Sequence, residues 1–78
     1  MQLIDLLSVI DEDTEVEVWA RDVDTQLPVS VGTYNGRDSI EPAFNNYEVI
    51  GVSSAAKGLI DITIDCEVFD DSEGIQIV

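Results

Sequence analysis

Two stretches in which charged and apolar residues alternate constrain the fold of this chain most. Residues 15–21 read Glu-Val-Glu-Val-Trp-Ala-Arg, and residues 60–67 read Ile-Asp-Ile-Thr-Ile-Asp-Cys-Glu. A period of two residues is that of a β-strand with one buried face and one exposed face. We therefore predict strands over 15–21 and 59–69, each with an apolar side facing a core and a mostly acidic exterior.

The remaining pattern predicts further elements. Leu3, Leu6, Leu7 and Ile10 form one apolar stripe at helical spacing, which predicts a helix over residues 1–10. Two more strands are expected over 27–34 and 47–53, with Ile50 and Val52 as a core pair, a helical turn over 39–45, and a short last strand or free tail over 75–78. We expect one domain over 1–78 with an α+β fold. In it, one N-terminal helix packs on a small, mostly antiparallel sheet of about four strands, joined as a meander.

Charge limits the choice of partner. The chain of 78 residues has 17 acidic and 3 basic residues and no histidine, which gives a formal net charge of −14. Such a surface repels anionic phospholipids and naked nucleic acid, so we expect a basic partner, with no membrane and no direct nucleic-acid binding. No basic-then-apolar leader and no apolar run of about 18 residues is present, and Cys66 is the single cysteine. The expected location is the cytoplasm, or the host cytoplasm if the chain is phage-encoded.

Most catalytic and metal-binding chemistry lacks its usual residues. Without histidine, the commonest general base and metal ligand is missing. Cys66 is expected to face the core, where a thiol acts as a small apolar group. The acidic run at Asp11 lacks the glycine of an EF-hand loop. We therefore expect no enzyme, no catalytic residue, no cofactor and no bound metal, with a weak enzyme or calcium-responsive domain as the remote alternative.

The acids on the strand exteriors and in the flanking turns are the candidate binding surface. Same-face residues on one strand repeat every ~6.6–6.8 Å. An acidic strand therefore carries about half as many charges per ångström as one DNA strand does along the helix axis. Two such strands lying close together would approach that density, and the acidic loops would extend the pattern at its ends. The expected partner-binding residues are Asp11, Glu12, Asp13, Glu15, Glu17, Trp19, Asp61, Asp65, Glu67, Asp70 and Asp71.

A simpler explanation stays open for these acids. Acidic side chains improve solubility, and charge on exposed sheet edges prevents aggregation. Trp19 has two interpretations as well: an outward interface anchor between Glu17 and Arg21, or a residue that covers a neighbouring strand or belongs to the core. The apolar end of the chain, residues 75–78, is a candidate for pairing with a sheet edge of this chain or of a second copy.

The run Leu3-x-x-Leu6-Leu7-x-x-Ile10-Asp11-x-Asp13-Thr14-x-Val16-x-Val18 resembles small acidic proteins of phages and mobile elements whose function is unknown. Those proteins open with a leucine-rich helix, an Asp-x-x-Thr turn and an alternating strand. They close on a two-stranded hairpin, which 47–53 and 59–65 would form here. By size and charge the chain also resembles phage-encoded DNA-mimic inhibitors of the anti-CRISPR and anti-restriction type. Those inhibitors share no sequence motif, so this resemblance implies a function but does not identify site residues.

These observations predict a non-enzymatic inhibitor or binding protein. It would present an acidic, nucleic-acid-mimicking surface to a basic nucleic-acid-binding protein or complex, such as a host defence complex. The alternative is a small self-associating interaction or assembly module, a homodimer for example, whose acidity serves only solubility.

Overall fold

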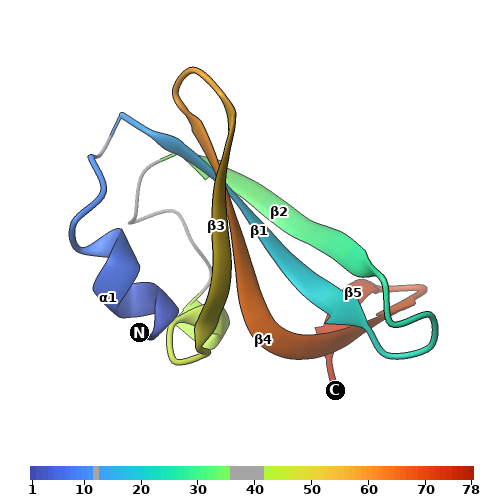
Figure 1. The fold of residues 1–78 in the computed structure, drawn as a ribbon. Helices are drawn as coiled ribbons and strands as arrows, with labels where there is room; N and C mark the ends of the chain where they lie inside the picture. The colour runs from blue at the N-terminus through green and yellow to red at the C-terminus, as the bar shows by residue number, and fades with distance from the viewer. Residues whose placement is uncertain (12, 36–41) are drawn as a thin grey trace.

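One β-sheet dominates the computed structural model, which describes residues 1–11, 13–35 and 42–78 (Figure 1). The strands are β1 (Glu15–Asp22), β2 (Pro28–Asn35), β3 (Val49–Ala56), β4 (Leu59–Asp71) and β5 (Gly74–Ile77). The helical elements are the α-helix α1 (Leu3–Leu7) and the 3-10 turn η2 (Pro42–Phe44).

The sheet is mixed, with strand order β2-β1-β4-β3. β1 is antiparallel to β2 but parallel to β4, while β3 and β5 are both antiparallel to β4. Val68 lies opposite Asp22 of β1 and opposite Ile77 of β5, so β5 is on the side of β4 that β3 also occupies. The expected meander is therefore wrong, because β1 and β4 are neighbours although two strands separate them in the chain.

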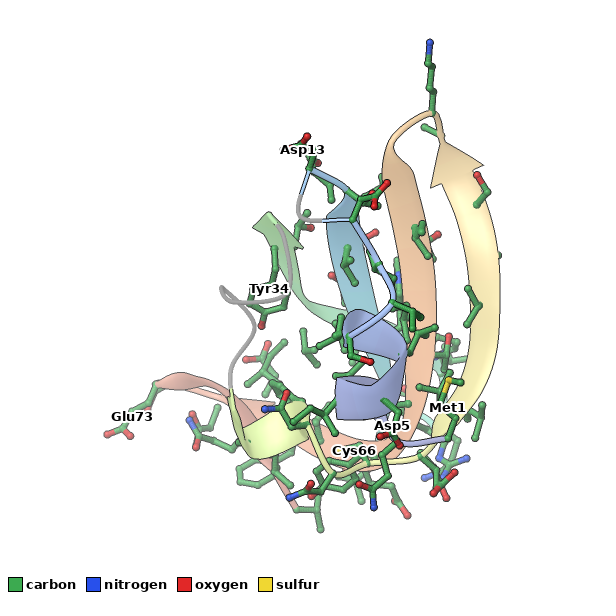
Figure 2. All side chains as sticks on the ribbon, turned by 90° about the vertical axis from the view of Figure 1, so that its left-hand side faces the viewer. Met1, Asp5, Asp13, Tyr34, Cys66 and Glu73 are labelled. Carbon is green, nitrogen blue, oxygen red and sulfur yellow. The ribbon has the colours of Figure 1, made fainter. Side chains whose placement is uncertain are left out.

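The core lies on one face of this sheet. Its largest fully buried side chains come from β1, β4 and α1: Leu3, Val16, Val18, Ile62, Ile64 and Val68. Phe44 of η2 is buried with them. Figure 2 shows α1 lying against the sheet on this side. The alternation in the sequence thus assigned the faces of β1 and β4 correctly.

The predicted α+β class, with about four mostly antiparallel strands, is wrong, because the described residues form a sheet-dominated fold with five strands in one mixed sheet and a single short α-helix. The helix is much shorter than its apolar stripe. α1 spans five residues, and the Ser8 hydroxyl donates to the Asp5 carbonyl at 2.6 Å just after it ends. Serine competes in this way for carbonyls that a continuing helix would use. Ile10 still packs against the core from the turn beyond the helix. The apolar stripe over residues 1–10 therefore marks side chains that pack against the core, although only five of these residues are helical.

Two further expectations need correction. Ile50 and Val52 are not a core pair, since they are 59% and 55% exposed. Ile50 lies in a register shift of β3 against β4 between Val49 and Gly51, and a bulge of this kind changes the direction of a side chain. Val52 lies opposite the buried Ile62 and so stays on the core side, but on the outermost strand, where it is exposed. The C-terminal segment forms β5 within the chain. Of the helical turn expected over 39–45, residues 39–41 lie outside the described part.

Candidate functional site: the open face of the sheet

The face of the sheet turned away from α1 carries most of the predicted site. We call it the open face and define it by alternate residues of the two central strands: Glu15, Glu17, Trp19, Arg21, Asp61, Thr63, Asp65 and Glu67. The buried residues of the same strands point to the opposite side, where α1 and η2 pack. None of the described helices covers the open face (Figures 1 and 2).

The parallel pairing of β1 and β4 brings the two acidic rows together. Glu17 lies opposite Asp61, and Trp19 lies opposite Thr63. From the level of Glu15 to Glu67, β4 advances eight residues, or about 26 Å. Five carboxylates along this length give about one charge per 5 Å, denser than a single strand row and less dense than one DNA strand.

Few of these carboxylates are neutralised. The Oε2 atom of Glu17 accepts hydrogen bonds from the Ser30 hydroxyl at 3.0 Å and from the Thr33 hydroxyl at 3.4 Å, both from β2. Arg21 Nη2 lies 3.5 Å from Asp65 Oδ1, and the two side chains are 41% and 60% exposed. In the described part of the chain, the other three open-face carboxylates have no ion pair. The open face therefore stays negatively charged, and hydrogen bonds from β2 hold the Glu17 carboxylate in place.

Trp19 lies in the middle of the open face. Its side chain is half-buried and its Nε1 atom is shielded from solvent without a hydrogen-bond partner. Arg21 Nε and Asp61 Oδ1 are shielded in the same way. No described helix covers this face, so we attribute the shielding of these atoms to neighbouring side chains. Trp19 is thus outward-facing, as the alternation predicts, and at the same time partly covered by its neighbours.

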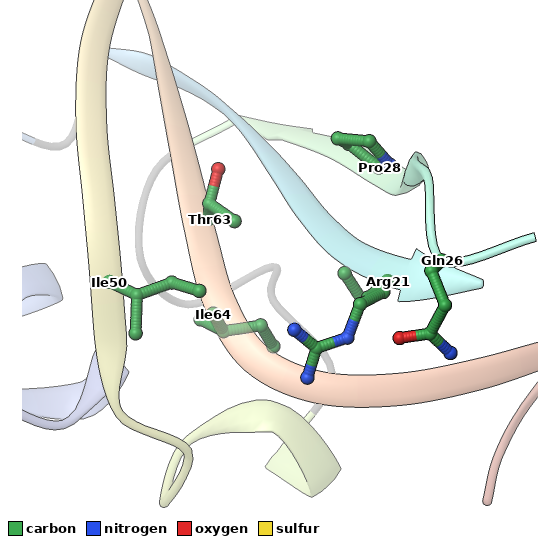
Figure 3. A pocket seen from close by; sticks show the side chains of 7 residues that line it. Arg21, Gln26, Pro28, Ile50, Thr63 and Ile64 are labelled. Carbon is green, nitrogen blue, oxygen red and sulfur yellow. The ribbon is translucent and has the colours of Figure 1, made fainter. Parts of the chain in front are cut away.

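A shallow pocket of about 180 Å³ opens at one end of this face (Figure 3). Its labelled lining comprises Arg21, Gln26, Pro28, Ile50, Thr63 and Ile64. The strand periodicity did not reveal this pocket, because it placed Ile50 in the core. The available signal was Gly51, since a glycine inside a strand often marks a bulge.

The other predicted site residues do not join the open face. Asp11 and Asp13 lie in the connection before β1, and Asp70 and Asp71 lie at the far end of β4. Figure 2 places Asp13 and Glu73, of the β4–β5 turn, at opposite ends of the molecule. Glu12 is outside the described residues. The acidic loops thus flank the face at its two ends.

The described residues contain no group of three or more histidine, cysteine, aspartate or glutamate side chains arranged to hold a metal ion. Within the same residues, no helix has the length and apolar character needed to cross a bilayer. Comparisons with protein-family models, curated proteins and solved structures found no match to this chain.

Proposed function

We propose that this protein is a non-enzymatic binding protein or inhibitor that places its open face in the nucleic-acid site of a basic partner. The resemblance in size and charge to DNA-mimic inhibitors makes a nuclease complex of host defence the favoured partner class. Lysine and arginine side chains that normally contact phosphates would instead meet the carboxylates of β1 and β4. Release of the counterions held by both surfaces would favour the complex.

The placement of the acids carries the proposal. Every acidic residue in a described strand belongs to β1 or β4, the two central strands. β2, β3 and β5, which form the outer edges, have none. Acids that protect a sheet from aggregation belong on its edges. Protection of the edges therefore does not explain this arrangement.

The arrangement also costs stability. Glu17 lies level with Asp61 on the neighbouring parallel strand, and like charges gathered on one face repel one another. A sheet under selection for solubility alone would mix charges of both signs or spread the acids apart. Concentration of repulsive charge on one uncovered face is the pattern expected of a surface that binds a basic partner.

Trp19 suits the same partner. An arginine guanidinium stacks favourably on an aromatic face, and tryptophan is a frequent anchor in the centre of protein interfaces. Trp19 occupies the level of the face where neither strand carries a charge, since Thr63 is its neighbour on β4. A basic groove would thus find carboxylates on both sides of one aromatic ring.

Displacement of labelled nucleic acid tests this proposal. A panel of bacterial nucleases, each holding a fluorescein-labelled DNA or RNA, is titrated with the protein while fluorescence anisotropy is recorded. We expect release of the label by at least one nuclease, with affinity falling steeply between about 50 and 200 mM salt. Polyglutamate of equal charge is the control for a nonspecific polyanion. A nuclease that binds the protein at saturation yet keeps its labelled nucleic acid would contradict the proposal.

A further inference from the structure

A second surface lies along the outer edge of β3, and it adjoins the open face at the pocket that Ile50 lines. β3 is the last strand in the sheet order and pairs with β4 on one side only. At its start the other side is occupied, because Val49 N–H donates to the Met1 carbonyl at 2.8 Å. Within the described chain, residues 50–56 have no strand on that outer side. Their outward backbone groups are available to another strand.

β3 lacks the charge and the proline that often keep an edge strand from pairing, and between its two register shifts against β4, at Val49–Gly51 and Ser54–Ala56, it offers a regular edge over residues 51–54. Its sequence, Val-Ile-Gly-Val-Ser-Ser-Ala-Ala, contains no charge and no proline. Ile50 and Val52 expose more than half of their side-chain surface. The opposite edge is different, since β2 begins at Pro28 and its Val29 and Val31 are half-buried against the core.

We propose that the β3 edge pairs with β3 of a second copy, so that two chains form one continuous sheet. An antiparallel pair of identical edges related by a two-fold axis is self-complementary, with apolar Val52 near the axis in both copies. The edge has no acid that a basic strand from another protein would recognise, which favours a second copy over the basic partner of the open face.

The charge of the chain does not prevent this contact. With two β3 strands between them, the β4 strands of the two copies are three strand spacings apart, or about 14 Å. That distance exceeds the Debye length of about 8 Å at 0.15 M ionic strength. Because an axis of this kind runs perpendicular to the sheet, both open faces point to the same side. The dimer would thus double the width of the acidic surface.

Sedimentation equilibrium of the purified chain tests the proposal. The wild type is compared with two variants of the β3 edge, Val52→Lys and Ile50→Lys. Thr33→Lys on β2 is the matched control. Circular dichroism checks that each variant is folded. We expect a reversible dimer that strengthens as salt screens the repulsion between copies. Both β3 variants should weaken it at least tenfold, and Thr33→Lys less than twofold.

Two results would overturn the dimer. One is a monomer at 500 µM protein in 0.5 M NaCl. The other is a dimer that Thr33→Lys weakens as much as Val52→Lys does. Binding to a basic partner weakens with salt whereas dimerisation strengthens, so failure of one proposal is distinguishable from failure of the other.

Discussion

Asp22 closes the turn between β1 and β2 through its side chain. Its Oδ1 atom accepts backbone N–H groups from Thr25 at 3.0 Å and from Asp24 at 2.8 Å. These hydrogen bonds, that of Thr25 first, favour the ionised carboxylate and lower the pKa of Asp22 below its usual value of about 3.9.

The sign of the resulting pH dependence follows from this direction. A carboxylate whose pKa is lower in the folded state stabilises the fold above its unfolded pKa. That contribution is lost as the pH falls through the folded pKa. We expect an NMR titration of the Asp22 carboxyl carbon to give a midpoint below about 3.9. A midpoint at or above that value would show that the turn does not hold the carboxylate in solution.

The fold lowers the reactivity of the Cys66 thiol. Cys66 is 3% exposed on the core side of β4, and burial raises its pKa, to which the carboxylates of Asp65 and Glu67 add. A hydrogen bond with Tyr47 acts in the opposite direction without cancelling this rise. Since the thiolate is the reactive form, the folded protein should react poorly with thiol reagents.

The rate of reaction with Ellman's reagent at pH 7.5 measures this property. We expect the folded chain to react on the order of 100-fold more slowly than the chain in urea, because only the unfolded thiol ionises freely. Equal rates in the two states would contradict the buried position of Cys66.

At the scale of elements, two isoleucines on neighbouring strands differ in their environment, one in the core and one at the sheet edge. Ile62 of β4 is fully buried, whereas Ile50 of β3 is 59% exposed. Ile62→Ala should lower the free energy of unfolding by about 2–5 kcal/mol because it leaves a cavity. Ile50→Ala should change it by less than about 0.5 kcal/mol. Urea denaturation checks both, and equal losses would restore Ile50 to the core.

Local patterns predicted some elements well and others poorly, for physical reasons. The alternation around Val18 and Ile62 is a strong signal, and it placed both strands and their faces. The neighbouring position of β1 and β4 was not predictable, because strand order depends on contacts between residues distant in the chain. The bulge at Gly51 reversed the expected burial of Ile50, since an extra residue in a strand alters the facing that a strict period assumes.

For the candidate site too, the local pattern predicted the direction of the side chains but not how the strands assemble. The outward position of Glu17, Trp19 and Asp61 follows from the period of each strand taken alone. Their assembly into one face follows only from the parallel pairing of β1 with β4. The pocket beside Arg21 and Ile50 depends on three strands and a bulge, so no local pattern contained it.

At the scale of the whole molecule, the net charge of −14 acts on stability. Self-repulsion opposes the compact state, and salt screens it. We expect the midpoint of thermal unfolding to rise by several degrees between about 10 and 200 mM NaCl. An uncharged osmolyte at equal osmolality is the control for general solvent effects. A midpoint that does not respond to salt would mean that the acids are too well separated to repel one another.

We expect binding to depend on where the negative charge lies rather than on its total. Two triple variants separate these quantities, because each removes three carboxylates and changes the net charge from −14 to −11. One variant acts on the open face: Glu15→Gln, Asp65→Asn and Glu67→Gln. The matched variant acts on exposed residues away from that face: Asp13→Asn, Asp24→Asn and Glu73→Gln.

The most direct measurement is the affinity of both triple variants for a nuclease whose nucleic acid the wild type displaces, at about 0.15 M salt. We expect the open-face variant to bind at least about tenfold more weakly, because it loses contacts with the basic groove. The matched variant should stay within about threefold of the wild type, since rim charges mainly affect the association rate. Equal losses of affinity in the two variants would rule out a specific role of the open face, because total charge alone would then explain binding.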